Sequence, residues 1–554
     1  MYCLEDGTAL AQGPVPSLDG PATAILHDTF GPGEAETRAQ IHTTDQTAVL
    51  PSGISEIQVS KSFDKRLLVA PLALALIVIG GFVGYRYFSA TKQIESIAVM
   101  PFVNESGNAD VEYLSDGMTE SLISSLTKLP NLNVKARSSV FRYKGKETDA
   151  KKIGDELNVQ TILNGRVAQR GDQLTLSLEL VDAATENAIW SQQYSRKQSD
   201  LVSLQSEIAR DVSSKLKSKL SGTDVAKVEK SYTVNPDAYQ FYLKGRFQWN
   251  KRTGEALKQA VEFFDQAIAE DPNYALAYSG LAEAYVLFPN FSVAAPTDCM
   301  PKAKAAALKA IELDDSLAEA HAALGIYLSA YSWNQAAAEK EFRRAIELNP
   351  TYPTAHQQFS NYCLLSMGRF DDALAEAKHA EKLDPFSPVI SADVAWPLYF
   401  ARRYDEAITQ LKGSLVLDAN FAVTRRYLGT IYDTRGMYNE AIAEYRKSPG
   451  LDDDPYLRAM LARSLAKAGQ RAEALRIVDE IVSESAARYV PANAVALAFA
   501  ALDDKDKAFV WLEKDVAQRA SRSAQYSVNP IWDDLRDDPR FAALVKKIEQ
   551  SKLD

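Results

Sequence analysis

The sequence predicts a multidomain chain with one transmembrane helix, a small α/β domain and an all-α superhelical solenoid. Three observations lead to this fold class. Nineteen uncharged residues run from Leu67 to Tyr85, leucines alternate with polar residues from Leu174 to Leu180, and an alanine recurs every 33 to 35 residues through the C-terminal half. These alanines are Ala303, Ala338, Ala373, Ala407, Ala441, Ala474 and Ala508. Such a fixed period indicates a solenoid, in which each unit buries its face only against its neighbours.

The residues around each alanine favour a pair of antiparallel helices. The clearest unit carries small and aromatic residues at Gly429, Tyr432, Gly436, Tyr438, Ala441 and Tyr445. Small residues let helices approach closely, and prolines such as Pro272, Pro350 and Pro385 end the second helix of a pair. These residues resemble the tetratricopeptide repeat (TPR). The resemblance covers residues 236–520 and implies seven or eight repeats, with an insertion expected within Pro289–Pro301.

The uncharged run predicts a single membrane-spanning helix over residues 67–88. At 1.5 Å per residue, 19 residues extend about 28 Å, close to the hydrocarbon thickness of a bilayer. The basic residues are slightly biased towards the N-terminal side, with Lys61, Lys65 and Arg66 before the run and Arg86 and Lys92 after it. This bias favours an N-terminus in the cytoplasm. Gly80 and Gly84 form a G-x-x-x-G pair that permits a homodimer, although membrane helices are rich in glycine generally.

Two further segments precede the predicted span. Tyr2–Leu10 resembles the last turn of a small zinc ribbon of bacterial membrane proteins, so residues 1–12 are interpreted as a ribbon remnant. The expected C-x-x-C is missing, either because the start lies further upstream or because the module has decayed, and Cys3 alone cannot form a tetrahedral zinc site. We therefore expect no metal. Residues 13–60 are acidic and rich in Gly, Pro, Ser and Thr, which predicts a disordered tail.

Residues 94–225 predict the α/β domain. A buried strand at Ile97–Phe102 is followed by a helix with Met118, Leu122, Ile123, Leu126 and Leu129 on one face and Ser115 or Asp116 as its N-cap. A strand at Leu132–Ala136, a helix at Asp149–Leu157, a strand through Leu174–Leu180 after a hairpin turn, and an amphipathic helix from Leu201 to Leu220 complete it. Segments such as Tyr113–Glu120 and Ala136–Lys146 are similar to the TolB-like N-terminal domain of bacterial envelope proteins. In that family the domain often lies between one membrane span and TPR repeats.

One basic segment is a candidate anion site for phospholipid headgroups, a polyanion or an acidic partner. It contains Lys135, Arg137, Arg142, Lys144 and Lys146 without an acidic residue, and the alternative interpretation is a solvated loop. The histidines are not spaced with acids or cysteines as metal ligands would be, and three separated cysteines build no disulfide framework. We find no catalytic motif and expect neither an enzyme nor a bound cofactor.

The predicted binding surface is the concave groove of the solenoid. In TPR domains the first helix of each unit lines this groove, and the family pattern transfers to Gln358, Tyr362, Trp396, Tyr399, Arg426, Thr430, Asp433 and Arg463. Aromatic and arginine side chains are favoured anchors for peptides. Trp396 and Tyr399 are equally compatible with helix packing, whereas the charges of Arg426 and Asp433 predict exposure, because unpaired charges are seldom buried.

Together these features predict a bacterial inner-membrane scaffold. Residues 94–520 would lie in the periplasm, with residues 521–554 as a C-terminal cap of the solenoid. A protein or peptide is the expected partner, and the net charge of −11 argues against general nucleic-acid binding. One alternative is a signalling or transcription-regulatory protein with a cytoplasmic output. Another is an envelope assembly or transport accessory that binds polysaccharide or lipid.

Overall fold

The computed structural model describes residues 94–129, 131–216, 226 and 228–552. The chain divides into two compact units, Met1–Ala90 and Thr91–Asp554, and all described residues belong to the second. The predicted zinc-ribbon remnant, acidic tail and membrane span, including Gly80 and Gly84, lie outside the described residues. Among the helices of the described ranges, none is both long and apolar enough to cross a membrane.

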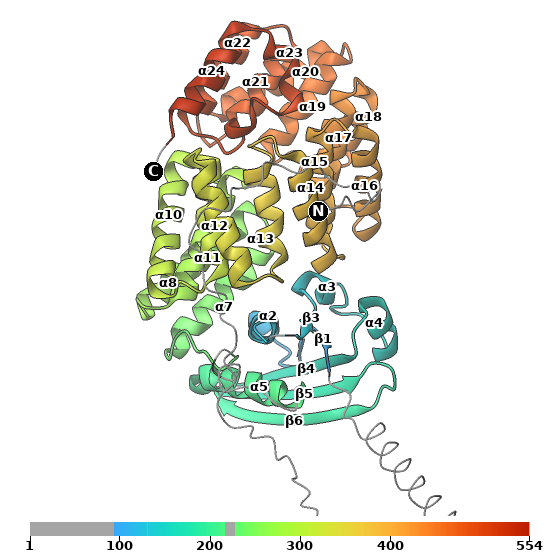
Figure 1. The fold of residues 1–554 in the computed structure, drawn as a ribbon, viewed down its shortest axis with the longest axis vertical. Coiled ribbons are helices and arrows are strands. Elements are labelled where there is room, and N and C mark those ends of the chain that lie inside the picture. Colours follow the sequence, from blue (N-terminus) through green and yellow to red (C-terminus); the bar gives the residue numbers. More distant parts are fainter. Residues whose placement is uncertain (1–93, 130, 217–225, 227, 553–554) are drawn as a thin grey trace, which may run out of the picture. The chain divides into compact units, whose positions relative to one another are not determined.

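The N-terminal part of the described chain is an α/β domain built on a six-stranded sheet (Figure 1). The strands are β1 (Ser96–Val99), β2 (Val103–Asn104), β3 (Asn133–Val134), β4 (Thr161–Arg170), β5 (Gln173–Asp182) and β6 (Ala188–Lys197). Their order is β3-β1-β4-β5-β6, with β2 also beside β4. The pairs β1–β3, β1–β4 and β2–β4 are parallel, whereas β4–β5 and β5–β6 are antiparallel hairpins.

In the described part of this domain, four helices accompany the sheet: α2 (Glu112–Thr127), α3 (Arg137–Phe141), α4 (Ala150–Leu157) and α5 (Leu201–Leu216). The predicted apolar face of α2 is buried in one core with alternate leucines of β5 and the inner face of α5. The N-cap prediction was wrong. Ser115 and Asp116 lie buried inside α2, because a 3₁₀ turn capped by Asn108 leads directly into the helix at Glu112. Strand β6 was not foreseen, since it is polar and mostly exposed and has little alternation.

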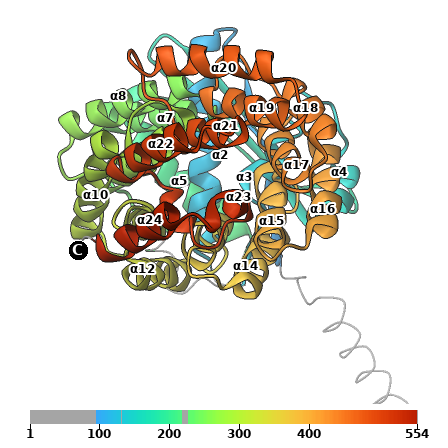
Figure 2. The same ribbon diagram turned by 90° about the horizontal axis from the view of Figure 1, so that it is seen from above.

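The solenoid consists of eight successive helix pairs within residues 236–517. The pairs are α7 (Pro236–Asn250) with α8 (Gly254–Glu270), α9 (Ala275–Leu287) with α10 (Pro296–Leu313), α11 (Ala318–Ile326) with α12 (Gln335–Leu348), α13 (Pro353–Gln358) with α14 (Phe370–Leu383), α15 (Pro388–Phe400) with α16 (Tyr404–Leu417), α17 (Ala422–Thr434) with α18 (Tyr438–Arg446), α19 (Pro455–Lys467) with α20 (Arg471–Glu484), and α21 (Ala492–Ala501) with α22 (Lys505–Ala517). Turns of π-helix at Tyr327–Tyr331 and Phe359–Leu364 extend α11 and α13. Figure 2 shows the pairs following a curve from α7 to α22.

The repeating alanines mark the contact between the two helices of each pair. Every one of them, and Ala260 before them, lies in the second helix and is 0% exposed. In several pairs a glycine of the first helix faces an aromatic ring of the second: Gly245 and Phe264, Gly325 and Phe342, and Gly429 and Tyr445. The hydrogen atom of glycine leaves the space that the ring occupies, so helix spacing is set by this small-against-large packing.

A polar contact also recurs between the helices of a pair. His321, His356 and Arg425 occupy corresponding positions and bond Glu341 at 2.7 Å, Glu376 at 2.6 Å and Glu444 at 2.7 Å. Each also bonds a backbone carbonyl six residues earlier in the chain. The sequence interpretation missed that two histidines pair with acids, because the partners are 20 residues apart and meet only after the hairpin forms.

The chain after α22 turns back onto the middle of the solenoid. Arg519 Nε donates to the carbonyl of Tyr331 at 2.8 Å, and Gln525 Nε2 donates to that of Asn361 at 2.8 Å. The helices α23 (Asp533–Arg536) and α24 (Pro539–Gln550) follow, and Arg402 Nη1 pairs with Asp533 at 2.6 Å. Helix α24 buries Phe541, Leu544 and Ile548 in the core of the last repeats, so this segment covers the end of the solenoid and also closes its curve.

We predict that Gly429→Ala destabilises the protein, because the added methyl group would overlap the ring of Tyr445. Overpacking of this kind costs about 1–3 kcal/mol. Gly413→Ala, also within a helix but with nothing near its added Cβ, is the matched control and is expected to raise stability by about 0.5–1 kcal/mol. Thermal unfolding of both variants checks the prediction, and equal melting temperatures would contradict it.

Candidate functional site

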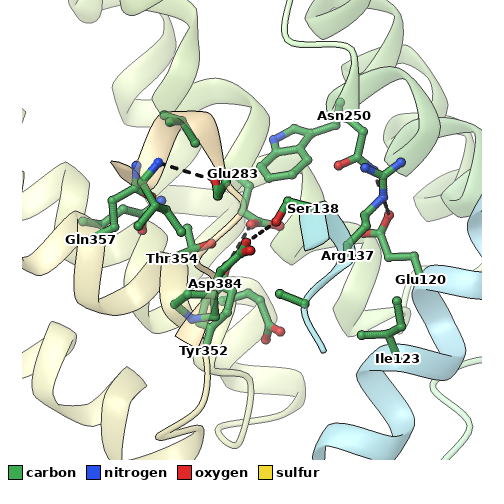
Figure 3. A pocket seen from close by; sticks show the side chains of 18 of the residues that line it. Glu120, Ile123, Arg137, Ser138, Asn250, Glu283, Tyr352, Thr354, Gln357 and Asp384 are labelled. Atoms are coloured by element: carbon green, nitrogen blue, oxygen red, sulfur yellow. Dashed lines mark hydrogen bonds and ion pairs between the residues drawn. The ribbon is translucent and has the colours of Figure 1, made fainter. Parts of the chain in front are cut away.

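A cavity of about 2530 Å³ lies between the α/β domain and the inner helices of the solenoid, and is called the central cavity below (Figure 3). Its lining comes from α2, from residues 131–138, from the first helices α7, α9, α13, α15 and α17, and from residues 521–525. Cavities of this kind, with convergent polar groups, are the usual binding sites of proteins. The first helices therefore line an inner surface, as the TPR resemblance implied.

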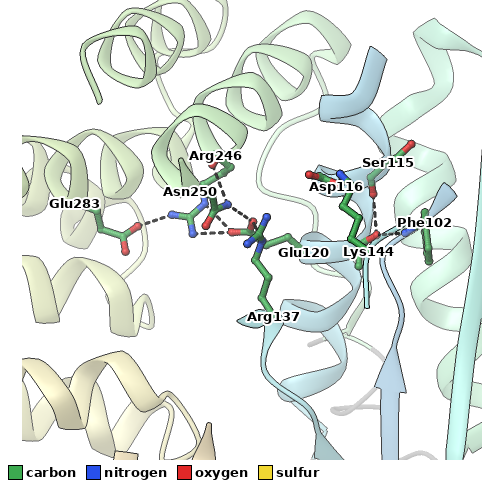
Figure 4. Close-up of polar contacts among 10 residues, drawn as sticks. Phe102, Ser115, Asp116, Glu120, Arg137, Lys144, Arg246, Asn250 and Glu283 are labelled. Carbon is green, nitrogen blue, oxygen red and sulfur yellow. Dashed lines mark hydrogen bonds and ion pairs between the residues drawn. The ribbon is translucent and has the colours of Figure 1, made fainter. Parts of the chain in front are cut away.

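One wall of the central cavity is a charged network that joins the α/β domain to α7 (Figure 4). Arg246 contacts Glu120 of α2 at 2.6 Å and Glu283 of α9 at 2.7 Å. Asn250 Nδ2 donates to Glu120 at 2.7 Å, and Arg137 lies 3.2 Å from the same carboxylate. Burial raises the pKa of Glu120, but Arg246 and Arg137 outweigh it and hold that pKa below its ordinary value. The network is thus internally neutralised.

A second attachment joins the α/β domain to the loop between α14 and α15. Ser138 and Ser139 of α3 both donate to the carboxylate of Asp384, the latter at 2.8 Å, and Figure 3 shows Ser138 directed at this group. The guanidinium of Arg142 lies 4.4 Å from the ring centre of Phe386. Burial raises the pKa of Asp384, whereas the two serine hydroxyls lower it. The α/β domain therefore contacts two separate regions of the solenoid.

Half of the predicted groove residues line the central cavity: Gln358, Tyr362, Trp396 and Arg426. Trp396 also packs between Tyr399 and Tyr427, with ring centres 5.0 and 4.2 Å away. Tyr399 and Thr430 are buried among helices and do not line the cavity. Trp396 therefore fits both interpretations, because its indole forms part of the cavity wall and also packs between helices.

The expectation that the charge of Asp433 would keep it exposed was wrong. Asp433 is 2% exposed, and its carboxylate accepts hydrogen bonds from Arg463 Nε at 2.7 Å and from the hydroxyl of Ser464. Arg463 is itself buried. The two predicted groove residues form an ion pair between α17 and α19, and each charge tolerates burial because the other compensates it. Neither lines the central cavity.

The five basic residues of the predicted anion site do not form one patch. Arg137 joins the Glu120 network, Lys144 pairs with Glu112 at 2.6 Å and Asp116 at 2.5 Å, and Arg142 lies over Phe386. Lys135 lines the central cavity, where burial lowers its pKa, and Lys146 is exposed. The acids that neutralise this segment come from α2, and each lies 17 or more residues before the base that it contacts, so the local sequence did not reveal them.

Other cavity residues were missed by the sequence interpretation. Asp393 of α15 accepts from Gln357 at 2.5 Å and from Tyr427 at 2.9 Å, and Arg522 reaches the cavity from the C-terminal segment. The two charged residues are far apart in sequence, and Arg522 lies outside the repeat pattern.

In the described ranges no group of three or more His, Cys, Asp or Glu side chains could hold a metal ion. Burial raises the pKa of both Cys299 and Cys363 to about 12.

Comparison with known proteins relates the α/β domain to regulators. Residues 92–211 match the family described as HilA/YgeH-like transcriptional regulator, second domain. The chain is 32% identical over 235 residues to "Putative adenylate cyclase 3" of Rhizobium meliloti (strain 1021), covering 42% of this chain and 40% of that protein. It is 28% identical over 172 residues to the transcriptional regulator HilA of Salmonella typhimurium, covering 31% of each. The chain thus spans less than half the length of these relatives. The TolB-like resemblance stays a prediction.

Solved structures of helical repeat proteins resemble parts of the chain. The TPR protein YrrB, described as having an unusual peptide-binding site, has a TM-score of 0.24 at 21% identity over 34% of this chain and 90% of its own. The Cut9–Hcn1 heterotetramer of the APC/C gives 0.41 at 12% identity over 86% of this chain and 82% of its own. At these values the likenesses do not establish a function.

We predict that Asp433→Ala lowers stability strongly, because it leaves the buried guanidinium of Arg463 without its main partner. Breaking a buried ion pair on one side costs about 3–5 kcal/mol. The control is Glu480→Ala, which removes an exposed ion pair with Arg476 and is expected to cost about 0.5 kcal/mol or less. Thermal unfolding compares the two. An Asp433→Ala variant as stable as the control would restore this residue as a candidate for partner contact.

Proposed function

We propose that the chain is a non-enzymatic interaction scaffold that holds a protein or peptide segment in the central cavity. The single observation that carries the proposal is the cavity lining, which combines the first helices of the solenoid with aromatic and arginine side chains. Trp396, Tyr362 and Arg426 are the residue types that anchor peptides. A segment in the cavity would contact several repeats at once, as expected for a repeat protein with a concave inner surface.

More specifically, we propose that this scaffold has a regulatory role. It is favoured by the match of residues 92–211 to a domain of transcriptional regulators and by the relative named as an adenylate cyclase. The α/β domain contributes Glu120, Arg137 and Ser138 to the cavity, so a segment bound by the solenoid would also touch the domain that regulators share. Occupancy of the cavity would then be communicated through the α/β domain.

We further propose that residues 67–88 anchor this scaffold in a bacterial inner membrane. The support is the uncharged run of 19 residues and the bias of flanking basic residues. The N-terminus would then lie in the cytoplasm and residues 94–554 in the periplasm. A partner of the cavity would be a protein of the cell envelope.

We predict that a photo-crosslinking amino acid at Gln358 captures a specific partner in the native host. The control position is Val416, which is 85% exposed on α16 and does not line the cavity. Purified partner added in excess should compete with crosslinking at Gln358, and the adduct should map to a single segment of the partner. Equal capture at the two positions would refute a cavity-specific role.

We predict a periplasmic signal from a compartment-sensitive reporter fused after Asp554. The expectation follows from the one predicted span and the slight excess of basic residues before it. A reporter fused after Arg66 should give the opposite signal and controls for expression. A cytoplasmic signal from the fusion after Asp554 would overturn the proposed orientation and would restrict the partner search to cytoplasmic proteins.

A further inference from the structure

Three arginines that line the central cavity, Arg252, Arg426 and Arg522, lack a carboxylate partner within the described residues, and the last two lie beside the same aromatic ring. Arg426 comes from α17, and Arg522 comes from the segment that follows α22 and turns back onto the repeats. Their guanidinium carbons lie 5.6 and 5.4 Å from the centre of the same ring, that of Tyr456. Within the described residues the guanidinium contacts of both are with aromatic rings and not with a carboxylate, and Arg426 Nε is buried without an acceptor. Arginines in enclosed places normally have such partners.

Two other arginines of the solenoid, Arg425 on α17 and Arg463 on α19, show what is missing. Arg425, adjacent to Arg426, pairs with Glu444 at 2.7 Å, and Arg463 pairs with Asp433 at 2.7 Å. Arg426 and Arg522 act electrostatically on the carboxylate of Asp393. Both arginines lower the pKa of Asp393, whereas burial raises it by a larger amount. Its two oxygens are already bonded by Gln357 and Tyr427. The region therefore holds two positive charges and one occupied carboxylate.

Other buried polar atoms in the lining also lack partners. They are Trp249 Nε1, Ser279 Oγ and Asn361 Oδ1. Trp249 and Ser279 are 7% and 2% exposed, so desolvation of these groups is unfavourable unless something in the cavity bonds them. These atoms are independent of the arginines and belong to residues that line the same cavity.

We propose that Arg426 and Arg522 bind an oxyanion, a carboxylate or phosphate group, carried by the ligand of the central cavity. Guanidinium groups bind both anions through charge-assisted hydrogen bonds, and both of these arginines line the cavity beside the ring of Tyr456. This inference deepens the proposed function, on which it rests, by naming the group that the cavity recognises. The site exists only when residues 518–529 lie against the middle repeats, because Arg522 belongs to that segment.

The test measures binding of small oxyanions to the purified full-length chain in detergent at fixed ionic strength. Pyrophosphate probes phosphate recognition and citrate probes carboxylate recognition, each by isothermal titration calorimetry. We expect one of the two to bind, and Arg426→Gln and Arg522→Gln to weaken that binding at least tenfold. Arg476→Gln removes the same charge at an exposed position and should leave the dissociation constant within a factor of two.

Two further variants keep the test decisive if a glutamine substitution unfolds the protein. Arg522→Lys and Arg426→Lys keep the charge but lose the planar set of donors, so they should bind more weakly than the natural chain while retaining its circular dichroism spectrum. Absence of binding by both probes to the natural chain, or unchanged affinity in the arginine variants, overturns the proposal. Neither result bears on crosslinking at Gln358, so the proposed function would fail or stand separately.

Discussion

The close contact between the two helices of each repeat is the constraint on which the solenoid depends. A fully buried alanine in every second helix sets the distance between helices, and in three pairs an aromatic ring over a glycine of the first helix adds to it. Because this distance recurs in eight pairs, small differences at each interface add along the chain and determine its curvature. The curvature then decides whether the first helices surround a cavity, and whether the C-terminal segment can reach Tyr331 and Asn361.

The polar contacts add specificity to this apolar packing. The bonds of His321, His356 and Arg425 join the helices of one pair, whereas Asp433 and Arg463 join successive pairs. A buried charge left without its partner is unfavourable, so each contact penalises a shifted helix register. Arg426 and Arg522 differ in this respect from Arg425 and Arg463, whose charges are neutralised by Glu444 and Asp433.

The sequence predicted features that repeat or that depend on neighbours along the chain. The period of the alanines located the helix pairs, and the alternation through Leu174–Leu180 located β5. Features that depend on distant partners were not predictable. Asp433 looked like an exposed charge because Arg463 is 30 residues away, and Arg137 looked free because Glu120 lies in another helix. Arg522 carried no signal, since it belongs to no repeat and reaches the cavity only through the turn of the last segment.

The double attachment of the α/β domain has a mechanical consequence. Glu120 holds the first helix of the solenoid through Arg246, and Ser138 and Ser139 hold the loop at Asp384 after the fourth pair. The α/β domain thus connects two points of the solenoid that are separated by four repeats. Any change in the pitch of those repeats alters the distance between the two anchor points, so one attachment must stretch or the domain must rotate. A change of curvature in the solenoid is in this way converted into strain at the surface of the α/β domain.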